Sequence, residues 1–159
     1  MSTPPAPRPD LRNPVHLLAF GFGAGLSPVA PGTAGTLLGV LIYLALLRIP
    51  LPYYLGACGL LFLAGVWICD KTSRDLRVHD HGGIVFDEIV GFLVAVIALP
   101  PAWPWIVVGF VLFRALDIVK PWPIGWFDRR VRGGLGIMLD DLLAGLAAFA
   151  LLQFANGLF

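Results

Sequence analysis

The chain carries little charge, and long stretches of it carry none. Charged residues make up 13% of its 159 residues, against about 25% in an average soluble protein. No carboxylate lies between residues 11 and 69, and the eighteen residues after Asp141 hold no charge at all. Hydrophobic residues make up 58% of the chain. A composition so poor in charge argues against a soluble domain and predicts helices within a lipid bilayer.

Other absences narrow the class of function. The net charge is only +1, so no overall electrostatic attraction to nucleic acid is expected. The two cysteines, Cys58 and Cys69, lie within one apolar run, which favours free thiols over a disulfide framework. The chain contains none of the motifs Cys-x5-Arg, Asp-x-Asp-x-Thr or Gly-x-Ser-x-Gly. A covalent nucleophile is therefore not visible in the sequence.

Five apolar runs account for most of the chain after its first residues. Pro100 and Pro101 separate the third run from the fourth, because proline interrupts a helix. These two runs hold sixteen and seventeen residues and as helices would be about 25 Å long, a little short of the hydrocarbon core of a bilayer. We expect them to be either shallow spanning helices or a hairpin that enters the membrane and returns. The five runs cover residues 33–49, 51–69, 84–99, 102–118 and 135–159.

The sequence therefore predicts an all-α fold, a polytopic membrane bundle with short re-entrant or shallow helices. Residues 1–13 are rich in proline and are expected to form a disordered arm, and residues 14–159 a single membrane-embedded domain. Residues 70–83 and 119–134 hold most of the lysine and arginine, which assigns both to the cytoplasmic side. This topology brings the start of the third run, the end of the fourth and the start of the fifth to one membrane interface.

Nine of the ten acidic residues lie between Asp70 and Asp141, and two adjacent pairs stand where a charged loop meets an apolar run. Ionisable groups at membrane depth are costly and often mark functional sites. The pair Asp87-Glu88 also has a simpler explanation, because acids in the first turn of a helix interact favourably with its dipole. Asp140-Asp141 follows a glycine-rich segment. Two such pairs at one interface repel each other unless a cation lies between them, and Mg²⁺ suits both oxygen ligands and phosphate.

Two further segments allow two interpretations each. Arg114 and Asp117 are three residues apart, so a salt bridge explains both; alternatively, Asp117 binds a metal while Arg114 and Lys120 bind phosphate. Residues 27–36 hold Ser27 and Thr33 and lead into a helix, whose N-terminus is suited to anions. The same segment is equally explained as a proline- and glycine-rich loop capped by its threonine.

The triplet His79-Asp80-His81 raises the question of zinc. A zinc site needs three or four nitrogen or sulfur ligands, and His16 is the only other histidine. A turn, or one histidine that assists proton transfer or contacts phosphate, is the favoured interpretation.

Three segments stand in a specific order along the chain. They are GFGAGLSPVAPGTAGT, HDHGGIVFDEIVG and FRALDIVKPWPIGWFDRRVRGGLGIMLDDLLAG, and they run from about Leu18 to Gly145. Together they resemble the phosphatidylglycerophosphatase A family. The resemblance implies a Mg²⁺-dependent phosphatase of the bacterial inner membrane, with its site facing the cytoplasm. Its substrate would be the lipid phosphatidylglycerophosphate, cleaved to phosphatidylglycerol and inorganic phosphate in glycerophospholipid biosynthesis.

The resemblance also points to individual residues, and the separate roles given to them here are our inference. Its acidic motifs fall on Asp87, Glu88, Asp140 and Asp141, which are the candidate catalytic residues. The candidate metal ligands are Glu88, Asp117, Asp140 and Asp141, with Asp87 as a further ligand or as a base. The candidate phosphate-binding residues are Ser27, Thr33, Lys71, Arg114, Lys120 and Arg129.

Two questions stay open at this point. Attack by a metal-activated water on the phosphomonoester is the favoured reaction, and a covalent aspartyl-phosphate remains an alternative. A function of another class, a divalent-cation transporter or channel, also needs acidic residues within a membrane. Such a protein would place its carboxylates along a path near the middle of the bilayer, whereas these gather at the ends of the apolar runs.

Overall fold

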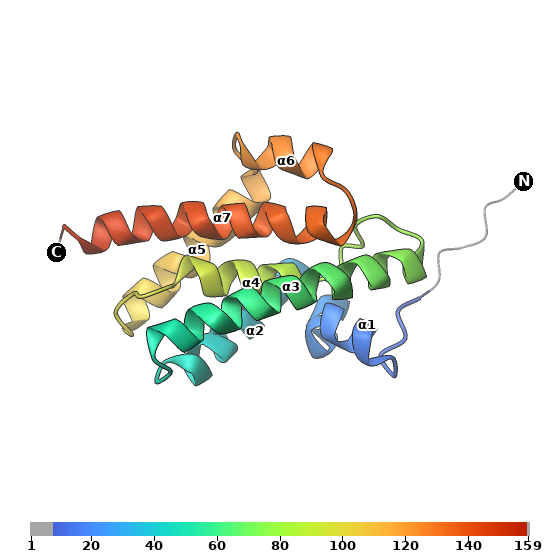
Figure 1. Cartoon of the computed structure of the whole chain (residues 1–159), viewed down its shortest axis with the longest axis horizontal. Helices are drawn as coiled ribbons and strands as arrows, with labels where there is room; N and C mark the ends of the chain where they lie inside the picture. The colour runs from blue at the N-terminus through green and yellow to red at the C-terminus, as the bar shows by residue number, and fades with distance from the viewer. Residues whose placement is uncertain (1–7, 159) are drawn as a thin grey trace, which may run out of the picture.

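Residues 8–158, the part that the computed structural model describes, fold into helices joined by turns and loops (Figure 1). No β-strand occurs within these residues, so the predicted all-α fold is confirmed. Of the predicted disordered arm, residues 1–7 lie outside the described residues, and Asn13 caps the first helix with a hydrogen bond from the backbone N–H of Val15. The elements are α1 (Pro14–Ala19), the 3-10 helix η1 (Gly21–Leu26), α2 (Pro31–Leu46), α3 (Leu51–Leu76), α4 (Phe86–Ala95), α5 (Trp103–Val119), α6 (Ile124–Arg130) and α7 (Gly133–Asn156).

Proline residues set many of the helix boundaries. Helices α1, α2, α3 and α5 each have proline in their first two positions, where its missing N–H costs no helical hydrogen bond. Pro50 precedes α3, and Pro100 and Pro101 lie between α4 and α5. The chain reverses at these points, so consecutive long helices run in opposite directions (Figure 1).

Helix α4 is the centre of the bundle. It packs against α2, α3, α5 and α7, and all of its residues except Glu88 are buried. A helix that is apolar on every face needs such an environment. Its ten residues give a length of about 15 Å, only half the thickness of the hydrocarbon core. The third apolar run is therefore a buried core helix that turns back into α5.

Close backbone contact joins α4 to α7. A Cβ atom on Gly145 would overlap the carbonyl oxygen of Gly91, and one on Gly91 would lie 2.8 Å from the carbonyl oxygen of Asp141. The aromatic ring of Phe113 fills the space beside Gly91. Small residues of this kind let helices approach closely in an apolar environment. The contact places the Asp141 turn of α7 directly against the first turns of α4.

The outer surface of the bundle is largely apolar. Helices α3 and α7 are long and apolar enough to cross a membrane, judged by length and composition. On α3 the side chains of Leu60, Leu63 and Trp67 are more than 60% exposed, and on α7 Phe154 is exposed to a similar extent. Exposed apolar surface of this extent fits contact with lipid. We treat the chain as a membrane protein with these two helices as its candidate spans.

The α4–α7 contact leads to a stability prediction. The Gly145→Ala substitution should destabilise the protein by about 1–3 kcal/mol, because the added methyl group forces the two backbones apart. The matched control is Gly56→Ala on α3, where no atom lies within 4 Å of the added Cβ. Thermal unfolding of both variants in detergent measures the difference, and equal melting temperatures would contradict the importance of this contact.

Candidate metal and phosphate site

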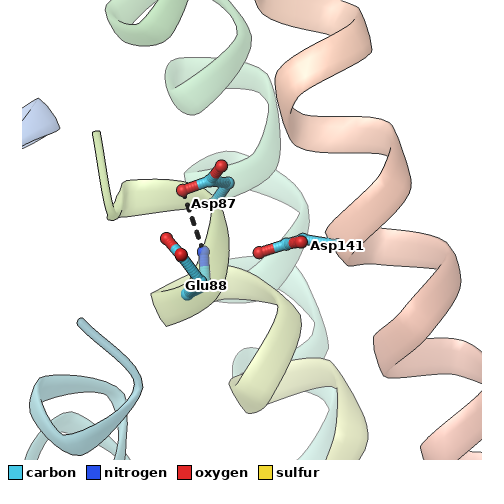
Figure 2. Close-up of side chains that lie close together, drawn as sticks. All are labelled: Asp87, Glu88 and Asp141. Atoms are coloured by element: carbon cyan, nitrogen blue, oxygen red, sulfur yellow. Dashed lines mark hydrogen bonds between the residues drawn. The ribbon is translucent and has the colours of Figure 1, made fainter. Parts of the chain in front are cut away.

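Carboxylates from α4 and α7 meet at the end of the bundle where both helices begin. Asp87 and Glu88 lie in the first turn of α4, and Asp141 reaches them from the third turn of α7 (Figure 2). One carboxylate oxygen from each of the three residues lies within 4.8 Å of the other two. Asp87 also accepts a hydrogen bond of 3.1 Å from the backbone N–H of Glu88, which fixes its orientation.

A second group of carboxylates shares Asp141 with the first. Asp117 from the last turns of α5 and Asp140 from α7 each offer an oxygen within 4.8 Å of the other and of Asp141. The two groups therefore form one continuous set, which we call the carboxylate cluster: Asp87, Glu88, Asp117, Asp140 and Asp141. The predicted convergence of these acids at one end of the bundle is found in the structure.

Two basic side chains contact the cluster. Arg114 lies 3.6 Å from Glu88 and donates a hydrogen bond to Asp117, so it links α5 to α4 as well as forming the expected local salt bridge. Lys120, which ends α5 in a left-handed conformation, donates to Asp140 and, at 2.7 Å, to Asp128. Burial lowers the pKa of Lys120, but its hydrogen bonds to Asp128 and Asp140 outweigh that effect and raise the pKa. Lys120 is therefore a permanent positive charge at neutral pH.

The cluster contains more buried negative charge than these bases can balance. Burial raises the pKa of Asp87 well above its ordinary value, and the nearby charges of Glu88 and Asp141 add to the effect. Burial likewise raises the pKa of Glu88. Both residues lie on α4, outside the two candidate spans. A buried carboxylate is tolerated when it is paired or coordinates a metal, so a cation bound here would stabilise the ionised carboxylates.

Several buried polar atoms of the cluster and of Arg114 beside it have no hydrogen-bond partner among the described residues. They are Glu88 Oε2, Arg114 Nε, Asp140 Oδ1 and Asp141 Oδ2. Three of the four are carboxylate oxygens, and the cluster contains neither histidine nor cysteine. An all-oxygen set of this kind suits a hard divalent cation such as Mg²⁺ better than zinc. The cluster can therefore hold a metal ion.

The N-terminus of α2 covers the Glu88–Arg114 pair. A Cβ atom on Gly32 would overlap Glu88 Oε1 and would lie 3.0 Å from Arg114 Nη2, so only glycine allows this approach. Ala30 takes the N-cap position without a side-chain hydrogen bond, so Thr33 does not cap the helix as one interpretation of the sequence required. Thr33 follows Gly32 in the first turn and is only partly buried, so it lies one residue along the chain from the glycine that approaches Arg114.

Two of the predicted phosphate-binding residues do not contact the cluster. Lys71 donates a hydrogen bond of 2.6 Å to Asp75. An oxygen of Asp75 also lies 3.1 Å from the Nε2 atom of His16, so Lys71 belongs to a network that joins α1 to α3. Ser27 donates to the backbone carbonyl of Val29. Arg129 lies in a cleft beside Asp140. Of the predicted bases, Arg114 and Lys120 are the two that the fold brings to the carboxylates.

The two histidines of the His79-Asp80-His81 triplet contact backbone rather than the cluster. His79 Nε2 accepts the N–H of Gly133 at 3.1 Å, and His81 Nδ1 accepts that of Gly83 at 3.1 Å. Asp70 accepts the N–H of Gly134 at 3.1 Å. Asp70 and His79 therefore hold the start of α7, and with it the register of Asp140 and Asp141. Sequence reasoning missed this role, and it missed Asp128 as a partner of Lys120.

Comparison with known proteins identifies the family. The sequence profile described as Phosphatidylglycerophosphatase A matches residues 17–156. The chain belongs to the phosphatidylglycerophosphatase A family. The Phosphatidylglycerophosphatase A of Escherichia coli (strain K12) is 47% identical over 148 residues, which cover 92% of this chain and 86% of the relative. No solved structure matches the chain.

Two other relatives extend the comparison. The Phosphatidylglycerophosphatase A of Haemophilus influenzae (strain ATCC 51907 / DSM 11121 / KW20 / Rd) is 48% identical over 149 residues, covering 91% of this chain and 90% of the relative. A protein of Bacteroides thetaiotaomicron, named for a proposed phosphatidylinositol-3-phosphatase activity, is 40% identical over 148 residues, covering 88% and 92%. The family resemblance in the sequence is confirmed, and these relatives are bacterial.

The imbalance of charge in the cluster leads to a prediction for this member of the phosphatidylglycerophosphatase A family. Mg²⁺ at about 100 times its Kd should raise the melting temperature by roughly 5–10 °C, since a ligand that binds only the folded state stabilises it. Asp141→Asn should abolish most of this shift while leaving the metal-free protein at least as stable, because it removes buried charge. Asp10→Asn, outside the cluster, should keep the full shift. A full Mg²⁺ shift in Asp141→Asn would contradict metal binding by the cluster.

Proposed function

We propose that this protein hydrolyses phosphatidylglycerophosphate to phosphatidylglycerol and inorganic phosphate, a step of glycerophospholipid biosynthesis. The observation that carries the proposal is the carboxylate cluster with Arg114 and Lys120 beside it, at one end of an apolar bundle. Two relatives, each nearly half identical over most of the chain, are named Phosphatidylglycerophosphatase A, and this name supplies the substrate. Acids for a metal and bases for a phosphate are the groups that phosphoryl transfer requires.

The proposed ligands of Mg²⁺ are Glu88, Asp117, Asp140 and Asp141, each of which offers an oxygen to the cluster. Three of these residues also have a buried oxygen without a hydrogen-bond partner, and the fourth, Asp117, is paired with Arg114. When bound, Mg²⁺ would stabilise negative charge on the phosphoryl oxygens and lower the pKa of a coordinated water. Asp87 is the proposed base, or a further ligand. Its carboxylate lies within 4.8 Å of those of Glu88 and Asp141, so it is close enough to the metal ligands for either role.

Arg114 and Lys120 are the proposed bases for the scissile phosphate, and the first turn of α2, which holds Thr33, lies against Arg114 at Gly32. Arg129, in the cleft beside Asp140, is proposed to bind a phosphate of the same substrate farther out. Arg114 and Lys120 are held here by the same carboxylates that are proposed to bind the metal. Once those carboxylates bind a cation instead, Arg114 and Lys120 are able to bind a phosphate. Roles for Ser27 and Lys71 would need movement away from Val29 and Asp75, which are their present partners.

We place the bundle in the bacterial inner membrane, with the cluster facing the cytoplasm. The basic residues at the end of α3 and just after it (Lys71, Arg74 and Arg77) and those of the α5–α7 connection support this orientation, because positively charged segments stay on the cytoplasmic side. Helices α3 and α7 are the proposed spans. The short helix α4 packs against both and need not cross the membrane, since it is buried among the other helices.

The rival function, a divalent-cation transporter or channel, is less well supported. The cluster occupies only the end of the bundle where α4 and α7 begin. At the other ends of α2 and α4, a cavity of about 170 Å³ is lined by apolar and aromatic residues such as Tyr43, Leu46 and Leu99. A cation would find no further carboxylate there, because every acidic residue of the described α2, α4 and α5 segments belongs to the cluster.

Amide substitutions in the cluster test the proposed reaction. Glu88→Gln and Asp140→Asn should each lower kcat for phosphate release by at least about 100-fold, equivalent to about 2.7 kcal/mol of lost transition-state stabilisation. The assay measures phosphate released from phosphatidylglycerophosphate in detergent micelles with Mg²⁺, and removal of the metal with a chelator should have a comparable effect. The control Asp10→Asn makes the same acid-to-amide change outside the cluster and should keep normal activity. Normal release by both cluster variants would refute the metal site.

Cysteine labelling tests the proposed orientation. The natural cysteines, Cys58 and Cys69, are both buried and can be replaced by alanine to give a background without accessible thiols. A membrane-impermeant maleimide should then label Arg132→Cys, beside the start of α7, only from the cytoplasmic face. Arg48→Cys, in the turn between α2 and α3, should be labelled only from the opposite face. Labelling of both positions from one face would exclude the proposed topology.

A further inference from the structure

A cleft of about 250 Å³ opens beside the carboxylate cluster. His79 and Asp80 line it from the loop after α3, Asp128 and Arg129 from the end of α6, and Asp140 from α7. His79 and Asp70 hold the loop after α3 to the start of α7, and α6 packs against α7 directly. The phosphate chemistry proposed for the cluster uses Asp140 but leaves the rest of the cleft without a ligand.

The cleft is continuous with the cluster through Asp140. The side chain of Asp140 is only 8% exposed, it belongs to the second carboxylate group, and its Oδ1 atom has no hydrogen-bond partner among the described residues. Lys120 bonds both Asp140 and Asp128, and so joins the inner wall of the cleft to its rim. A ligand whose phosphate lies at the cluster can therefore extend into the cleft past Asp140.

The chemistry of the lining favours hydroxyl groups over a second anion. Three of its members, Asp80, Asp128 and Asp140, are acids, and a carboxylate accepts hydrogen bonds but donates none when ionised. Arg129 is the one guanidinium, and it lies at the exposed rim. A ligand that fits this lining carries a hydroxyl donor close to its phosphate and a negative charge farther out. A phosphorylated glycerol attached to a lipid phosphodiester has this arrangement.

We propose that this cleft binds the glycerol unit between the scissile phosphomonoester and the phosphodiester of the substrate. Asp80 accepts a hydrogen bond from the glycerol hydroxyl, and Arg129 contacts the phosphodiester at the rim. The two residues thereby select a lipid whose phosphomonoester is carried on a hydroxyl-bearing headgroup. This inference rests on the proposed function, and it adds Asp80 as a specificity-determining residue.

The first test compares two lipids on the unaltered protein. Phosphatidate carries its phosphomonoester directly on diacylglycerol, so it has no glycerol headgroup to place in the cleft. With matched acyl chains in the same detergent micelles, kcat/KM should be at least about tenfold higher for phosphatidylglycerophosphate, the value of one good hydrogen bond to a charged group. A preference below about twofold overturns the inference, because the cleft then contributes nothing to selection.

The second test separates substrate binding from chemistry. Asp80→Asn and Arg129→Gln should each raise KM for phosphatidylglycerophosphate by about tenfold and leave kcat within about twofold, because each removes the charge that strengthens a contact away from the reacting atoms. The matched controls are Asp10→Asn and Arg132→Gln, which make the same changes outside the cleft and should leave both constants unaltered. Both cleft residues are exposed, so the variants should fold normally.

The possible failures are distinguishable. An unaltered protein that releases no phosphate from phosphatidylglycerophosphate overturns the proposed function itself. Normal release with an unchanged KM in both cleft variants overturns the cleft assignment alone. A fall in kcat with unchanged KM also overturns it, since Asp80 and Arg129 would then act on the scissile phosphate rather than on the headgroup.

Discussion

The backbone contact between Gly91 on α4 and Gly145 on α7 is the constraint on which the rest of the structure depends. Any side chain larger than hydrogen at Gly145 would overlap the carbonyl oxygen of Gly91, so the two helices can approach this closely only at glycine. One turn before Gly145, Asp141 is brought against Asp87 and Glu88. The distance between the two helices thus sets the distance between their carboxylates, and packing in the apolar core determines the geometry of the charged site.

The buried charge of the cluster then explains why the surroundings are built as they are. Unpaired carboxylates in a low-dielectric environment oppose folding, so the fold must supply that free energy elsewhere. Helix α4 carries its two acids in its first turn only, where the helix dipole favours them, and it buries apolar side chains at the remaining positions. A site kept ready for a cation and a phosphate is less stable without them, which is a common property of functional sites.

The sequence allowed the convergence of the acids to be predicted, because apolar runs that alternate with charged loops must bring every second loop to the same side. It did not reveal that α4 is enclosed by four other helices, since an apolar run of this length has the same sequence pattern whether it contacts lipid or protein. The pairing of Lys71 with Asp75 was also not predicted, although the two residues are four apart on one helix. Contacts such as those of Gly32 with Glu88, or of Lys120 with Asp128, depend on tertiary packing that no local pattern records.

The position of the cluster relative to exposed apolar residues bears on how a lipid substrate would reach it. Ile118, Val119 and Trp122 flank Lys120 and are each more than 65% exposed, although Lys120 itself points inward to Asp140. On α6, the guanidinium of Arg130 lies 4.3 Å above the ring of Trp126, a combination suited to the interface between hydrocarbon and headgroups. Apolar side chains thus surround a charged site at close range. A headgroup could enter the cluster while its acyl chains stay in the bilayer, so the substrate need not leave the membrane for hydrolysis.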